Sequence, residues 1–167
     1  MAAARADGVL PVILTGNCHS QQAVVSGLGT EPLGLVWLDC HADFNTPETT
    51  PTGYFDGYGL AMVVGDCWQT LCATVPGFIP LRQDQVLLVG VRDTDPGEGE
   101  RLERSAIHCL DVPDVERLAD QLTAAVSALA GRRELAALTL SAYDPSYDAD
   151  GRVREAAVAA VQGAFGP

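Results

Sequence analysis

The sequence predicts an α/β fold, a three-layer α-β-α domain with a mainly parallel sheet and right-handed crossovers. The first observation is that short apolar runs with β character alternate with helical patterns along the whole chain. The second is the length, because 167 residues fit one domain with one ordinary core. A hydrophobic fraction of 47% agrees with a globular protein. We therefore expect a single domain over residues 1–167.

The predicted elements follow one another in a regular order. Five segments have the composition of strands: residues 9–15, 35–39, 85–91, 106–110 and 135–142. Five segments fit helices: residues 21–28 capped by Ser20, 60–74, 98–104 after a Pro96-Gly97 turn, 113–130 with Asp111 as a possible cap, and 151–164. In the second helix Gly65 is a point of weakness, and Cys67 and Cys72 are predicted core residues. The polar stretch 45–59 is a long loop of the kind that binds ligands or is disordered.

The composition excludes several classes of partner. Ten basic and 22 acidic residues give a formal charge of −12, which repels phosphate backbones and anionic lipid, so we expect neither nucleic acid nor a membrane as partner. The apolar runs are too short to span a bilayer, and residues 1–7 lack the hydrophobic region of an export signal. Five cysteines, an odd number without paired spacing, favour reduced thiols and a cytoplasmic location.

The segment 35–45 predicts a metal site. An apolar run ends in Asp39, His41 and Asp43, and an extended backbone would point these alternate side chains to the same side. The carboxyl ends of parallel strands are where such sheets gather ligands, and two carboxylates with an imidazole suit manganese, iron or zinc. A structural alternative is an acidic strand end that only solvates the loop. His19, at a strand-to-helix junction, is by itself more typical of a hydrogen-bonded turn than of a ligand.

Four stretches together resemble one family. GNCHS (16–20), DCHADFNTPETTPTGYFDG (39–57), GVRDTDPGE (90–98) and LTLSAYDPSYD (138–148) are similar to the arginase and agmatinase ureohydrolases, and GNC in place of GGD resembles the arginase-like amidinohydrolase branch. These enzymes hydrolyse guanidino groups to urea at a two-manganese site. The resemblance implies a shortened arginase-like fold, and a guanidino compound as the small-molecule substrate.

The resemblance also implies roles for individual residues. The implied metal ligands are His19, Asp39, His41 and Asp43, with Asp39 in the bridging position between two Mn²⁺ ions that activate water. Asn45 and Thr52 match residues that hold the α-carboxylate of the substrate, and Asp95 matches the one that receives its α-amino group. Asp43 and Asp56 are the implied catalytic residues, although Asp56 stands where the family has a histidine.

The chain also departs from the family pattern. The second Asp-x-Asp of the family is not found, with Asp111 as a candidate remnant of one ligand, and the late glutamate falls at Ala142. The first strand and helix of the family are missing as well, which indicates a divergent or truncated member that can lack one of the two ions. Because a shortened sheet leaves edges and apolar faces uncovered, we expect a homo-oligomer.

Three hypotheses for the function follow. The first is a manganese-dependent hydrolase of a guanidino (amidine) substrate that releases urea or a related product. The second is a catalytically impaired relative that binds a metal or a partner. The third, a zinc site made of Cys18, His19, Cys40 and His41, is the least favoured because adjacent residues on strands point apart.

Overall fold

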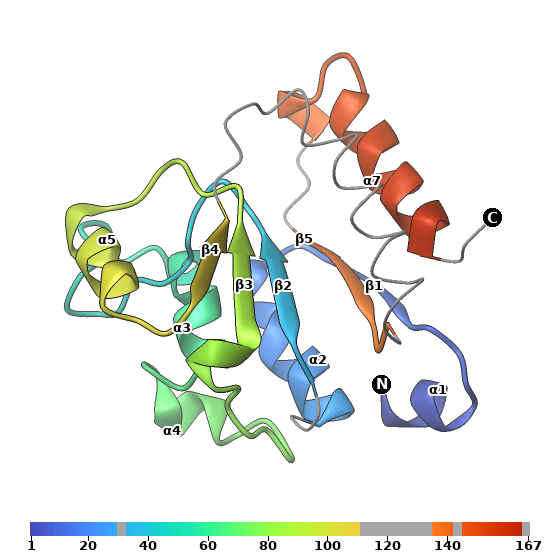
Figure 1. Ribbon diagram of the computed structural model, residues 1–167, viewed down its shortest axis with the longest axis horizontal. Helices are drawn as coiled ribbons and strands as arrows, with labels where there is room; N and C mark the ends of the chain where they lie inside the picture. Colours follow the sequence, from blue (N-terminus) through green and yellow to red (C-terminus); the bar gives the residue numbers. More distant parts are fainter. Residues whose placement is uncertain (30–32, 111–134, 142–144, 165–167) are drawn as a thin grey trace. The chain divides into compact units, whose positions relative to one another are not determined.

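The computed structural model describes residues 1–29, 33–110, 135–141 and 145–164 (Figure 1). The chain divides into two compact units, one made of Met1–Gly16 with Pro113–Pro167 and the other of Asn17–Val112. A single domain over residues 1–167 stays a prediction. Every predicted site residue from His19 to Asp95 belongs to the second unit.

The second unit is built on a three-stranded parallel sheet. Strands β2 (Leu35–Leu38), β3 (Val86–Val89) and β4 (His108–Leu110) lie in the order β2-β3-β4. All pairings in this sheet are parallel, as predicted. A further parallel bridge between His41 and Asp93 continues the pairing of β2 with β3 beyond the strand ends. The sheet register therefore brings the polar segments 39–43 and 92–95 side by side.

Helices cover one face of this sheet and form the core with it. Helices α2 (Gln21–Leu28) and α3 (Gly59–Val63) pack on the side of the buried strand residues Trp37, Val86 and Leu88 (Figure 1). The remaining helical segments of the unit are η1 (Cys18–Ser20), η2 (Phe55–Tyr58), α4 (Gln69–Cys72), η3 (Gln83–Gln85) and α5 (Pro96–Glu103).

The predicted helix over residues 60–74 is wrong in its length, because the chain breaks it in the middle. Helix α3 ends at Val63, Gly65 has φ +80° and Trp68 has φ +49°, and only then does α4 begin. A Cβ at Gly65 would lie 2.8 Å from Cγ of Pro80, so the turn needs glycine both for its φ and for space. The prediction that Cys67 and Cys72 are core residues is confirmed, since both are buried.

Two predictions about helix starts are also corrected. Pro96 and Gly97 are not a separate turn but the first residues of α5, where proline is favoured because its missing N–H would be unpaired anyway. Asp95 and Glu98 form a capping box at this start. Ser20 precedes α2 as expected, but its hydroxyl donates to the Asn17 carbonyl 2.7 Å away and makes no cap bond to the helix.

The first unit contains a second parallel pair of strands. Strand β1 (Val12–Thr15) pairs with β5 (Leu138–Ser141), with Val12 opposite Leu138. Three helical segments complete it: α1 (Ala2–Ala6), η4 (Pro145–Tyr147) and α7 (Arg152–Ala164). The predicted helix 113–130, its cap Asp111, and Ala142 lie outside the described residues. Within the ranges that the structure describes, no helix has both the length and the apolarity to cross a bilayer.

Candidate metal centre

Main-chain hydrogen bonds fix the ligand segment against the end of β3. The Asp39 N–H donates to the Val89 carbonyl (3.2 Å), and the carbonyl of Cys40 accepts from the N–H groups of Arg92 (3.0 Å) and Asp93 (3.1 Å). The Asp39 carboxylate then turns back on its own chain, where Oδ1 accepts from the His41 N–H at 3.0 Å. The position of Asp39 thus follows from sheet pairing and from a local turn.

Asp43 lies in a conformation that an extended strand would not give. Its φ is +49°, in the left-handed region, and its main-chain carbonyl accepts from the N–H groups of Leu60 (2.9 Å) and Ala61 (3.1 Å) at the start of α3. The residue is 6% exposed, and its Oδ2 has no hydrogen-bond partner among the described residues. Burial, and next the nearby charge of Asp39, raise the pKa of Asp43 to about 7.

Asp39 belongs to two groups of potential ligands whose donor atoms lie within 4.8 Å of one another. One contains Asp39, Cys40 and His41, and the other contains Cys18, Asp39 and Asp43. The structure therefore brings Asp39 together with His41 and with Asp43, but in two sets that share Asp39.

Two cysteines, Cys40 and Cys18, also belong to these groups of potential ligands. The Cys40 Sγ lies 3.2 Å from Nδ1 of His41, so the expectation that adjacent side chains point apart is wrong here. Burial, followed by the charge of Asp39, raises the pKa of the Cys40 thiol. The sequence gives one signal for Cys18 as a ligand, its place next to His19 in the same turn.

His19 is paired with Asp56 and stands outside both groups. Its Nδ1 lies 2.6 Å from Asp56 Oδ1, and its ring meets Phe55 edge to face at 5.0 Å between centroids. The other carboxylate oxygen, Asp56 Oδ2, accepts from Asn17 Nδ2 (2.9 Å) and the Tyr54 hydroxyl (3.3 Å). Burial acts to raise the pKa of Asp56, but the hydrogen bonds and the histidine lower it overall.

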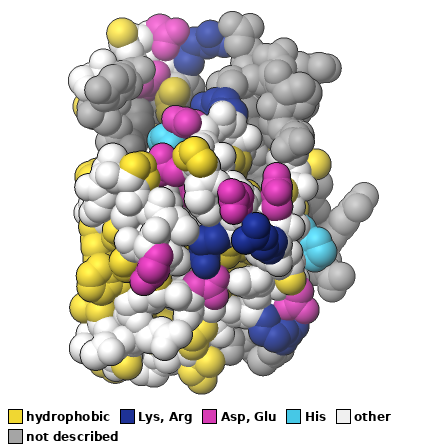
Figure 2. Space-filling model, turned by 90° about the vertical axis from the view of Figure 1, so that its left-hand side faces the viewer, with side chains coloured by type: hydrophobic (Ala, Val, Ile, Leu, Met, Phe, Trp, Pro, Cys, Tyr) yellow, Lys and Arg dark blue, Asp and Glu magenta, His cyan; other side chains and the backbone are white. Residues whose placement is uncertain are grey.

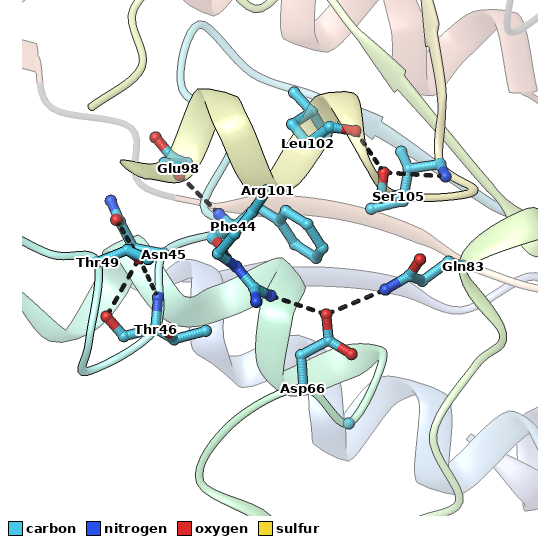
Figure 3. A network of polar contacts seen from close by, with 12 residues as sticks. Phe44, Asn45, Thr46, Thr49, Asp66, Gln83, Glu98, Arg101, Leu102 and Ser105 are labelled. Atoms are coloured by element: carbon cyan, nitrogen blue, oxygen red, sulfur yellow. Dashed lines mark hydrogen bonds and ion pairs between the residues drawn. The ribbon is translucent and has the colours of Figure 1, made fainter. Parts of the chain in front are cut away.

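The predicted substrate-binding residues are also distributed unevenly. Asn45 is buried, and its Nδ2 donates to Asp95 Oδ2 at 2.8 Å. Its Oδ1 accepts from the Thr49 hydroxyl at 2.9 Å, as drawn in Figure 3. Thr52 is exposed, and its hydroxyl oxygen accepts from the Tyr54 N–H at 3.2 Å. The structure thus joins Asn45 to Asp95 and leaves Thr52 near the tip of the loop.

The donor set around Asp39 fits a divalent cation. A buried carboxylate oxygen without a partner is costly, and at Asp43 it lies beside a second carboxylate and a thiol, so a cation there would satisfy it. Carboxylate oxygens suit manganese, whereas sulfur from Cys18 or Cys40 would extend the range to softer metals.

Comparison with known proteins shows the family. Residues 1–148 match the model of the Arginase family. The chain is 34% identical over 156 residues to the arginase of Eremothecium gossypii, which covers 87% of this chain and 38% of that protein. It is 32% identical over 114 residues to the arginase of Bacillus caldovelox, covering 66% of this chain and 38% of that one. The protein therefore belongs to the arginase family, and it spans less than half the length of these relatives.

Solved structures agree with this fold. The arginase of Bacillus cereus superposes with a TM-score of 0.86 at 20% identity, covering 99% of this chain and 74% of that chain. A formimidoylglutamase from Bacillus subtilis superposes with a TM-score of 0.67 at 14% identity, covering 95% of this chain and 60% of that one. The predicted shortened arginase-like α/β fold is thereby confirmed.

Proposed function

We propose that this chain is a metal-dependent hydrolase of a guanidino (amidine) substrate, arginase- or agmatinase-like, which releases urea or a related product. The observation that carries the proposal is the buried, unpartnered Oδ2 of Asp43 beside Asp39, at the end of a parallel strand pair. Membership of the arginase family supports guanidino chemistry at this place. Manganese is the proposed metal because both groups of potential ligands contain carboxylate oxygens.

The proposed ligands are the four predicted residues, with one addition. Asp39, His41 and Asp43 would hold the ion, and Cys18 would add a sulfur donor beside Asp43. His19 would be the fourth predicted ligand, although it lies outside these groups. Bound manganese would supply positive charge that lowers the pKa of water for attack on the guanidinium carbon. The buried carboxylates also favour a cationic substrate over a neutral one.

The remaining proposed residues bind substrate and carry protons. Asp95 attracts the cationic end of the substrate, and Asn45 and Thr52 offer amide and hydroxyl groups from the loop. Asp56, which is ionised and holds His19 at 2.6 Å, is proposed to act with Asp43 in proton transfer in place of the family's loop histidine.

A catalytically impaired protein that binds a metal or a partner is the second candidate. The observation that favours it is that Asn45 and Asp95 bond each other, so groups implied in substrate binding already satisfy one another.

Urea release from arginine, agmatine and N-hydroxyarginine, with Mn²⁺ titrated in, tests the choice between these candidates. We expect slow turnover that needs excess Mn²⁺, because the described ligand set is small for two ions. The Asp43→Asn variant should lose this activity, and the exposed Asp84→Asn variant should keep it. If the wild type releases no urea at any Mn²⁺ concentration, the second candidate, a catalytically impaired protein that binds a metal or a partner, is the one supported.

We also propose that the protein is a cytoplasmic homo-oligomer. Apolar side chains of the three-stranded sheet are exposed, among them Val36, Leu38 and Leu110. As a separate observation, hydrophobic side chains gather along the left-hand edge of the face drawn in Figure 2. Sedimentation velocity should give a mass that is a multiple of 17.5 kDa. A monodisperse monomer at micromolar concentration would contradict this expectation.

A further inference from the structure

Two side chains of α5 form hydrogen bonds with the main chain of Phe44, the residue that follows Asp43. Glu98 Oε1 accepts from the Phe44 N–H at 2.8 Å, and Arg101 Nε donates to the Phe44 carbonyl at 3.3 Å (Figure 3). Residues 98 and 101 are neighbours on one face of a helix, so a single element supplies both contacts. We call this pair of side chains the Phe44 clamp.

Further contacts fix the two side chains of the Phe44 clamp. The Arg101 guanidinium stacks over the Phe44 ring at 4.7 Å, and its terminal nitrogen donates to Asp66 Oδ2 at 2.8 Å. The same Asp66 oxygen also accepts from Gln83 Nε2 at 3.0 Å. Glu98 is 4% exposed, and its second oxygen accepts from the Asp95 N–H at 3.2 Å. Neither side chain of the clamp can move without breaking these bonds.

The clamp acts on the two peptide groups that follow Asp43: Arg101 binds the Phe44–Asn45 peptide, and Glu98 binds the Asp43–Phe44 peptide. The Asp43–Phe44 peptide contains the Asp43 carbonyl and the Phe44 N–H, so α3 binds its oxygen through Leu60 and Ala61 while Glu98 binds its nitrogen. Asp43 has a left-handed φ that is unfavourable for a residue with a side chain, and such a conformation persists only where surrounding contacts enforce it. Both ends of the peptide are enforced here.

We propose that Glu98 and Arg101 are positioning residues of the metal site, which hold the main chain on both sides of Phe44 so that the Asp43 carboxylate stays beside Asp39 and Cys18. The donor atoms of these three residues already lie within 4.8 Å of one another, and the buried Oδ2 of Asp43 is left for a cation. This inference rests on the proposed function, and it assigns to α5 the preorganisation of one ligand.

The test is the affinity of the full chain for Mn²⁺, measured by electron paramagnetic resonance of the unbound ion. Glu98→Leu and Arg101→Met should each weaken binding about tenfold or more, the loss typical of groups that orient a ligand. Glu98→Gln keeps an oxygen that can accept from Phe44 and should recover most of the affinity.

Two controls separate positioning from general stability. Arg104→Ala removes an exposed ion pair with Glu100 on the same helix and should leave the affinity unchanged. Ile107→Val disturbs the core without touching the clamp and should lower the melting temperature but not the affinity. If the clamp variants bind Mn²⁺ as the wild type does, the positioning role is overturned while the proposed function stands. If the wild type and Asp39→Ala bind Mn²⁺ equally poorly, the metal site and the inference that rests on it are both overturned.

Discussion

The metal-free protein should lose stability as the pH rises from about 4 to about 8. The pKa of Asp43 is about 7 in the folded state, against about 3.9 in an unfolded chain. Between these values the folded protein keeps a proton that the unfolded chain has released, so raising the pH favours unfolding. The protonated Asp43 therefore contributes to the free energy of unfolding fully below about pH 4, and this contribution is lost as the pH passes about 7. Its size is on the order of 4 kcal/mol.

Urea denaturation at several pH values in the presence of a chelator measures this effect. In the Asp43→Asn variant the free energy of unfolding should depend much less on pH. The variant should be more stable than the wild type at pH 8, because the amide has no charge to bury. Part of the pH dependence should remain in this variant, since burial also raises the pKa of Glu98. A metal-free wild type whose unfolding free energy is constant over this range would show that Asp43 is not buried as the structure describes.

Manganese should raise the melting temperature of the wild type, and Asp39→Ala should abolish that rise. An ion that binds only the folded state adds about 2.7 kcal/mol at a concentration 100-fold above its Kd. Asp39 is common to both groups of potential ligands, so its loss dismantles both at once. Thermal denaturation with and without Mn²⁺ gives the difference.

The control for this experiment is Asp84→Ala, which removes an exposed carboxylate paired with Arg82. It should respond to Mn²⁺ as the wild type does, because a surface carboxylate of this kind contributes little to stability or to a specific site. Equal responses of Asp39→Ala and the wild type would mean that the ion binds elsewhere.

The architecture was largely predictable because periodicity and strand-end chemistry are local properties. The strands over 35–38, 86–89 and 108–110 lie inside the predicted segments, and the alternation of helix and strand gave the parallel sheet. The predicted helix 60–74 is interrupted at Gly65 and Trp68, whose positive φ values no hydrophobic pattern reveals. The space at Gly65 is also limited by Pro80, which is distant in sequence.

The candidate site was less predictable, because its details depend on residues far apart in sequence. The pairing of His19 with Asp56 spans 37 residues, and the clamp on Phe44 spans 54 residues to Glu98. The alternation rule assumed an extended backbone through Asp43, but the start of α3 draws that peptide into a left-handed turn. Cys18 entered the ligand group by the same route, through packing rather than spacing.

Main-chain hydrogen bonds join the two ends of the loop between the metal site and α3. The Asp43 carbonyl holds the first N–H groups of α3, and the Asn45 N–H donates to the Gly57 carbonyl at 3.1 Å. Residues 42–46 are buried, whereas residues 51–54 are exposed. A wide swing of the whole loop would therefore unravel the start of a core helix, so free motion is confined to the exposed part of the loop. The base of the loop, next to Asp43, is thus the part that should open last when the loop unfolds locally.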